Sequence, residues 1–76
     1  MKFYLDTIEQ IKGENEGEFT EYGKRELKAD EQTAKVAFYT KLANVSNSSS
    51  HQYMDIKIVN SDGGIIKKDK LGEYID

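Results

Sequence analysis

The sequence predicts an α+β fold in which one helix packs on one face of an antiparallel-rich sheet of three or four strands. Three observations predict it: an alternating strand pattern near the N-terminus, a capped helix pattern in the middle, and a second alternating pattern that ends in a hairpin signal. The order of elements is ββαββ, or βαββ if the segment after the first strand is a loop. The 76 residues suffice for a single small domain, residues 1–76, with one core.

The first strand is expected over Lys2–Ile11, because apolar and polar residues alternate there. The residues predicted for its inner face are Phe3, Leu5, Thr7 and Ile11. Glu9 falls on the same face as a polar exception, and Tyr4 and Ile8 fall on the other face.

The segment after this strand is harder to interpret. Residues 12–18 predict a turn or loop, since two glycines enclose weak strand formers. Residues 18–27 predict a second strand that forms a hairpin with the first and lies near a sheet edge, although neither of its faces is clearly apolar. Gly23 suits a β-bulge in this strand.

A helix is expected to begin after Asp30, whose carboxylate can accept the amide of Gln32 or Thr33 as an N-cap. Apolar residues then recur at three- and four-residue spacing, which is the pattern of a helix facing a core. These residues are Ala34, Ala37, Phe38, Leu42 and Val45. The Ser/Asn-rich stretch over residues 44–51 is predicted to end the helix, because such side chains compete for backbone hydrogen bonds.

A further strand is expected over Gln52–Asn60, and it is followed by a hairpin turn at Ser61–Gly64 and a returning strand over Ile65–Lys68. The last residues, 70–76, could finish a strand or form one helical turn. The predicted core comprises Phe3, Leu5, Ile11, Ala34, Ala37, Phe38, Leu42, Met54, Ile56, Ile58 and one of Ile65 or Ile66.

Composition excludes several kinds of site. The chain has no cysteine and a single histidine, His51, so it offers no disulfide, no thiolate zinc site and no His-based metal site. We therefore expect neither a metal nor another cofactor. The N-terminus shows no apolar run of signal-peptide or membrane-span length, so we expect a cytoplasmic protein without membrane contact. A net charge of −3 argues against a general nucleic-acid binder.

Two groupings could carry chemistry, and we interpret both as structural. Ser48, Ser49 and Ser50 beside His51 hold the atoms of nucleophilic catalysis, but the pattern favours a solvated loop. The acidic run over residues 14–21 could hold a divalent cation weakly, but it favours a charged edge that discourages aggregation. We do not expect an enzyme.

Surplus tyrosines indicate a protein-binding surface, because tyrosine is favoured at interfaces. The candidates are Tyr4, Tyr22, Tyr53 and Tyr74. Tyr4 and Tyr53 have the parity of the sheet face opposite the helix, which makes that face the expected contact surface. Pairing with a second copy through an edge strand is also possible.

A basic patch provides the alternative function. It consists of Lys67, Lys68 and Lys70, and with exposed tyrosines it could contact nucleic acid. A small acidic inhibitor of a host enzyme, acting through residues 14–21, is a further alternative.

One resemblance adds to this interpretation. It is carried by Ala34, Phe38-Tyr39 and Leu42-Ala43 of the helix, then Ile56-x-Ile58-Val59-Asn60, then Asp62-Gly63-Gly64-Ile65-Ile66-Lys67. This pattern resembles short uncharacterised βαββ-type proteins of phages and conjugative elements in Gram-positive bacteria. The resemblance implies a bacterial cytosolic accessory protein, and no functional residues are carried over from it. The missing catalytic constellations, the mild acidity and the surplus tyrosines predict a non-enzymatic protein-interaction or accessory module, here of a bacterial mobile element.

Overall fold

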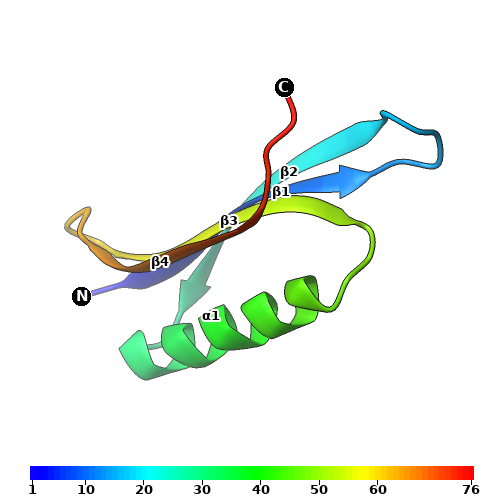
Figure 1. Ribbon diagram of the computed structural model, residues 1–76. Helices are drawn as coiled ribbons and strands as arrows, with labels where there is room; N and C mark the ends of the chain where they lie inside the picture. Colours follow the sequence, from blue (N-terminus) through cyan, green and yellow to red (C-terminus); the bar gives the residue numbers. More distant parts are fainter.

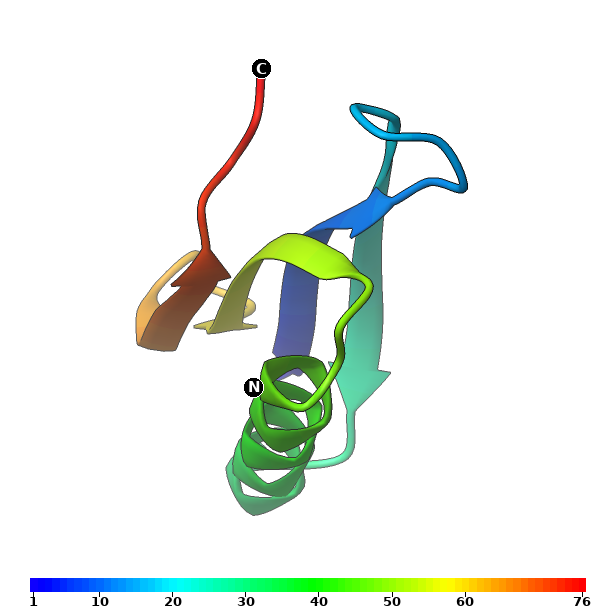
Figure 2. The same ribbon diagram turned by 45° about the vertical axis from the view of Figure 1, so that its right-hand side comes forward.

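The computed structural model describes all residues, Met1–Asp76, and confirms the α+β fold with the order ββαββ. The elements are β1 (Phe3–Lys12), β2 (Phe19–Lys28), α1 (Glu31–Ser46), β3 (His51–Asn60) and β4 (Ile65–Gly72). The strands form one four-stranded antiparallel sheet in the order β2-β1-β3-β4. Helix α1 lies against one face of it (Figures 1 and 2).

The core lies between α1 and the two central strands. Alternate residues of β3, namely Met54, Ile56 and Ile58, are fully buried and meet Phe38 of the helix. The buried apolar cluster comprises Leu5, Ala34, Phe38, Val45, Met54, Ile56 and Ile58, with Phe3, Ala37, Leu42 and Leu71 packed against it. The predicted inner faces of the helix and of the strand after it are thus confirmed, and so are Phe3 and Leu5 of the first strand. The predicted place of Ile11 in the core is wrong: Ile11 is half-buried and lies outside this cluster, beyond the register shift between Gln10 and Ile11.

The predicted contribution of Ile65 or Ile66 to the core is wrong. Ile65 is 54% exposed and Ile66 is 36% exposed. The register of β3 and β4 shifts between Ile58 and Val59, which places Ile65 opposite Val59 on the face away from α1. Leu71, paired with Met54, takes the place at the core instead.

Residues 19–28 form strand β2 at the edge of the sheet, which confirms the second predicted strand. The bulge predicted at Gly23 is wrong. Gly23 pairs directly with Ile8 in an unbroken register between β1 and β2. The irregularities lie elsewhere, at Gln10/Ile11 against β3 and at Ile58/Val59 against β4. A glycine without a positive φ fits a regular edge strand, where it needs no compensating neighbour.

Local side chains define the ends of the helix as expected. The Asp30 carboxylate accepts the Thr33 amide at 2.7 Å, which satisfies one of the free N–H groups of the first turn. At the other end, Ser46 Oγ and Asn47 Nδ2 both donate to the Ala43 carbonyl, at 2.9 and 3.0 Å. None of the structure's helical segments combines the length and apolarity that crossing a membrane requires.

Strand β4 ends in an extended tail and not in a helical turn. Gly72 has a φ of +75°, which turns the chain out of the strand. The tail then crosses the sheet on the side away from α1, where the Ile75 amide donates to Gln10 Oε1 at 2.9 Å (Figure 1). This contact leaves Gln10 only 5% exposed.

Candidate interaction surface on the open face of the sheet

The sheet face opposite α1, called the open face below, carries a row of apolar side chains across all its strands. Directly paired residues of neighbouring strands share a face. Tyr4 of β1 pairs with Leu27 of β2 and with Val59 of β3, and Val59 pairs with Ile65 of β4. Leu27 is 61% exposed and Ile65 is 54% exposed. These four residues form the apolar row.

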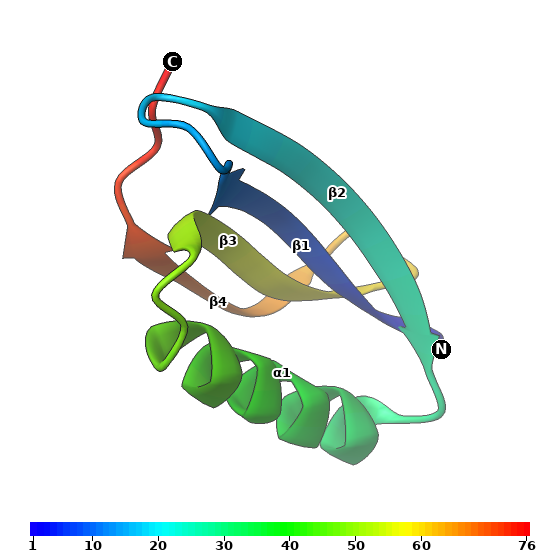
Figure 3. The ribbon, with the colours of Figure 1, turned by 90° about the vertical axis from the view of Figure 1, so that its right-hand side faces the viewer.

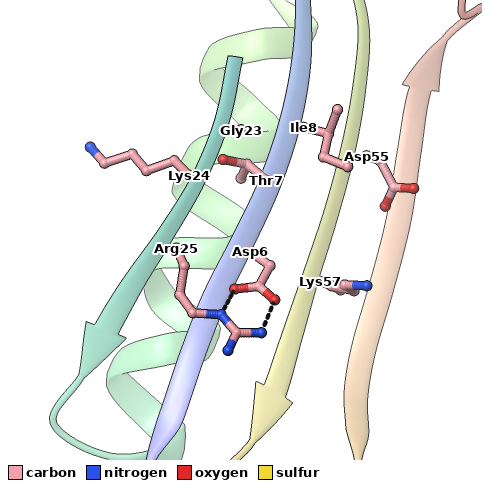
Figure 4. A pocket seen from close by; sticks show the side chains of 8 residues that line it. All are labelled: Asp6, Thr7, Ile8, Gly23, Lys24, Arg25, Asp55 and Lys57. Atoms are coloured by element: carbon pink, nitrogen blue, oxygen red, sulfur yellow. Dashed lines mark hydrogen bonds and ion pairs between the residues drawn. The ribbon is translucent and has the colours of Figure 1, made fainter. Parts of the chain in front are cut away.

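A charged row lies next to the apolar row. Asp6 pairs with Arg25 on one side and Lys57 on the other, and Lys57 pairs with Lys68. Arg25 donates from Nε and Nη2 to the two Asp6 oxygens at 2.7 and 2.6 Å, as Figure 4 shows. The bidentate hydrogen bonds to Asp6 raise the pKa of Arg25 above its already high value. The Arg25 guanidinium also lies 4.8 Å from the centroid of the Tyr4 ring, so both rows are linked.

A shallow depression of about 390 Å³ lies over the next row. Its floor includes Gly23, where the missing side chain leaves the space open beside Ile8 (Figure 4). Ile8 is 46% exposed. Asp55 and Lys70 pair with each other on the far side of this row. The depression thus joins an exposed aliphatic side chain to charged neighbours.

The far end of the open face is covered by the C-terminal tail. Tyr74 packs edge-on against Tyr53 with ring centroids 5.3 Å apart, and its hydroxyl donates to Glu21 at 3.2 Å. This hydrogen bond, together with the charge of Glu21, raises the pKa of Tyr74. Burial, and then the nearby Asp55, raises the pKa of Tyr53. Both phenols therefore stay protonated well above neutral pH.

The structure brings together only some of the predicted tyrosines. Tyr4, Tyr53 and Tyr74 lie on the open face, but Tyr4 is at one end and the other two are at the opposite end. Tyr22 pairs with Glu9 and therefore lies on the helix side of β2, where it is 52% exposed. Tyr22 is not part of the surface around Tyr4.

The predicted basic patch is divided between the two faces. Lys67 pairs with the core residue Ile58, and its Nζ lies 5.2 Å from the centroid of the Tyr39 ring on the helix. Lys68 and Lys70 lie on the open face with Lys57. The sequence interpretation missed Arg25, Lys57, Leu27 and Ile65, because only the strand register places them beside Tyr4. Strand parity alone assigns Leu27, Arg25 and Lys57 to one face of their strands, but it does not find Ile65, which the register shift in β4 moves to the open face.

The acidic run does not form one group. Glu14, Glu16 and Glu18 lie in the exposed β1–β2 loop, where Asn15 donates to Glu18 at 2.9 Å, whereas Glu21 lies on β2. No three histidine or carboxylate side chains converge in the arrangement that metal binding requires.

A polar cluster under the helix is the unexpected feature of the structure. Glu9 Oε1 lies 3.0 Å from Lys41 Nζ and 2.9 Å from His51 Nε2, and His51 Nδ1 lies 2.9 Å from Ser48 Oγ. The expectation of a solvated loop is wrong for His51, whose side chain is only 17% exposed. Sequence reasoning missed the Glu9–His51 contact because it spans 42 positions.

These groups occur in the order of a serine–histidine–carboxylate triad, but their contacts favour a structural role. The Ser48 hydroxyl accepts the Ser50 amide at 3.3 Å and lies 3.0 Å from the Ser50 hydroxyl. That amide is therefore directed at the hydroxyl and not at a position where an oxyanion would form. Glu9 is shared with Lys41, so the cluster fastens α1 and the 48–51 segment to β1.

Comparisons of this chain with protein-family models, with curated proteins and with solved structures found no match.

Proposed function

We propose that the protein is a non-enzymatic interaction module that binds another protein with the open face of its sheet. The observation that carries the proposal is the apolar row, in which Leu27 and Ile65 are each more than half exposed beside Tyr4. An apolar strip with tyrosine and arginine, surrounded by charged side chains, has the composition of a protein interface.

The charges of this face define the chemistry of the partner. Asp6 is neutralised by Arg25 through two short hydrogen bonds, so it presents little free negative charge. Lys57, Lys68 and Lys70 then give the area around the apolar row a basic character. The surface is complementary to a protein that presents an apolar strip beside carboxylates. Within a bacterial mobile element, such a module would act in the cytoplasm as an accessory factor.

The binding test compares two positions of similar exposure on opposite sides of the molecule. Ile65 on the open face is 54% exposed, and Val36 on the outer side of α1 is 56% exposed. To identify the partner, a photo-crosslinking amino acid is placed at Ile8, which lies on the open face but outside the apolar row. It should capture a partner with an acidic binding surface, and the same amino acid at Val36 should not. The purified partner should bind Ile65→Asp at least about tenfold more weakly, a change of about 1.4 kcal/mol, and bind Val36→Asp unchanged. Equal loss in both variants would contradict the proposal.

Nucleic-acid binding is the second candidate, because Arg25, Lys57, Lys68 and Lys70 share the face with Tyr4 and Tyr53. The exposed groups of the apolar row, however, are mainly aliphatic and cannot stack on bases as aromatic rings do. A salt-dependent mobility shift of single-stranded or duplex DNA that is lost in Lys68→Glu would favour this candidate.

Inhibition of a host enzyme through residues 14–21 is the remaining alternative. Because Glu14, Glu16 and Glu18 lie on an exposed loop, their charge can be reversed with little effect on the fold. Inhibition that survives this reversal would exclude that mechanism.

A further inference from the structure

Strand β2 has a long outer edge that no other element covers. It runs over ten residues, Phe19–Lys28, at the end of the sheet, without a proline or a register shift against β1. Figure 3 shows its outer side free of α1 and of the loops. An edge of this kind carries unpaired N–H and C=O groups and is a template for a further strand.

The hydrogen-bond pattern shows which residues present these groups. The Gly13 amide donates to the Glu18 carbonyl in continuation of the β1–β2 register. In an antiparallel pair, hydrogen-bonded and non-hydrogen-bonded positions alternate, so the even-numbered residues of β2 bond to β1. The odd-numbered residues direct their backbone groups outward: Phe19, Glu21, Gly23, Arg25 and Leu27. Gly23 is the midpoint of this set.

We propose that two copies of this chain pair through β2 in antiparallel orientation, with Gly23 opposite Gly23 of the second copy. Only this register pairs all five outward-directed residues, and with two bonds per pair it forms ten backbone hydrogen bonds. It joins the two sheets into one of eight strands. The two helices then lie on the same side of the joined sheet, and the two open faces lie on the other.

The side chains on the open face are complementary in this register. Glu21 lies opposite the second copy's Arg25, and Phe19 lies opposite the second copy's Leu27, each twice by symmetry. Registers whose symmetry axis passes through Tyr22 or Lys24 lose one of the five backbone-bonded pairs, and they no longer place Glu21 opposite Arg25. Registers centred on Glu21 or Arg25 place like charges opposite each other.

The groups that this pairing needs are free in the single chain. Asp6 engages Nε and Nη2 of Arg25, which leaves Nη1 for the second copy's Glu21. Tyr74 donates to Oε2 of Glu21, which leaves Oε1. At the symmetry axis, even a Cβ added to Gly23 would meet no atom within 4 Å.

The opposite edge of the sheet is less suited to pairing. The Glu73 amide donates to the Gln52 carbonyl, so alternation directs the backbone groups of Lys68 and Lys70 outward. Lysines on an edge strand oppose the approach of another strand. If two copies paired through β4, lysines of one chain would lie opposite lysines of the other. Pairing through the edge of β2 does not depend on whether the open face binds another protein.

Single-cysteine variants test the register, because the chain contains no cysteine of its own. Gly23→Cys places two thiols on opposite residues with Cα atoms about 5.5 Å apart, within the range for a disulfide. Leu27→Cys lies on the same strand, but its thiol would be about 27 Å from its copy, eight positions away along the strand. Lys68→Cys lies on the other edge. Under mild oxidation, Gly23→Cys should form a disulfide-linked dimer, and the other two variants should form no covalent dimer.

A charge exchange tests the same pairing without crosslinking. Glu21→Arg should raise the dimer dissociation constant at least tenfold in sedimentation equilibrium, because two arginines then face each other. The double variant Asp6→Asn, Arg25→Glu should show the same rise in the dissociation constant, because the new carboxylate at position 25 faces the second copy's Glu21. The change at Asp6 removes the repulsion between Asp6 and that new carboxylate within one chain. An equimolar mixture of Glu21→Arg with the double variant should form a heterodimer, because opposite charges then face each other at both positions. Circular dichroism checks that each variant is folded. A strictly monomeric unmodified chain at millimolar concentration, equal crosslinking at all three cysteines, or no heterodimer would overturn the proposal.

Discussion

Replacing Glu9 by glutamine tests the polar cluster that joins the helix to the sheet. Glu9 is 8% exposed, and one of its oxygens accepts hydrogen bonds from both Lys41 and His51. Burial raises the pKa of Glu9, but the hydrogen bonds and charges of Lys41 and His51 outweigh it, so the net pKa is lowered. The folded state therefore favours the carboxylate.

The magnitude follows from the two contacts. A hydrogen bond to a charged group contributes about 1.5–3 kcal/mol. The Lys41 side chain is 37% exposed, so solvent screens its share, and glutamine keeps one acceptor oxygen. We expect Glu9→Gln to lower the free energy of unfolding by about 1–2 kcal/mol at pH 7. For a domain of this size, each kcal/mol corresponds to a shift of about 4–8 °C in the melting temperature.

The pH dependence gives the sharper assay. A group whose pKa is lower in the folded state contributes fully above its unfolded pKa, and the contribution is lost as pH falls through the folded value. Urea unfolding should therefore show a large difference between the two chains at pH 7 and a much smaller one near pH 3. Glu16→Gln in the exposed loop is the control and should change stability by less than about 0.5 kcal/mol. A Glu9→Gln effect that is equal at both pH values would refute the role of the charge.

Other predictions concern the core, two glycines and one surface carboxylate. Phe38 is 1% exposed, so Phe38→Ala should lower the free energy of unfolding by about 3–5 kcal/mol in urea titrations; a loss under about 1 kcal/mol would place its ring outside the core. Gly72 has a φ of +75°, and an added Cβ would collide with the Gln52 carbonyl, so Gly72→Ala should destabilise by more than about 1 kcal/mol. Gly23→Ala, with open space around it, should leave the urea midpoint unchanged or raise it. Hydrogen bonds from Lys24 and Lys28 lower the pKa of Glu26 to about 2, so its carboxyl carbon should titrate near pH 2 by NMR; a midpoint near 4 would show that the lysines are not held there.

Local chemistry accounts for the parts of the fold that the sequence predicts. The alternation of Met54, Ile56 and Ile58 gave a strand with one buried face, and the structure buries all three completely. Asp30 gave the start of the helix, because its cap depends on a residue only three positions away. In each case the signal lies within one segment: the spacing of apolar residues along the strand, and a cap between residues three positions apart.

The errors come from interactions between segments. Ile65 is exposed because a register shift in β4 moves it to the open face, and nothing in the apolar pair Ile65-Ile66 indicates that shift. Gly23 looked like a bulge because glycine weakens a strand, but an edge position accommodates it regularly. The same difference between local signals and contacts between segments applies to the candidate site. Parity placed Tyr4 and Tyr53 correctly, whereas the partners of Tyr4 in the apolar row depend on strand order.

Leu27 connects the two proposed contacts of this protein. In the single chain it ends the apolar row at the edge of β2, and in the paired register it lies opposite the second copy's Phe19. Because Leu27 is four positions from the symmetry axis at Gly23, the two apolar rows of a dimer would lie about 27 Å apart along the strand direction. A partner centred on one row leaves the other row available to a second partner molecule. A two-fold symmetric or elongated partner could bind both, and its apparent affinity would then fall in Glu21→Arg although that change leaves the apolar row intact.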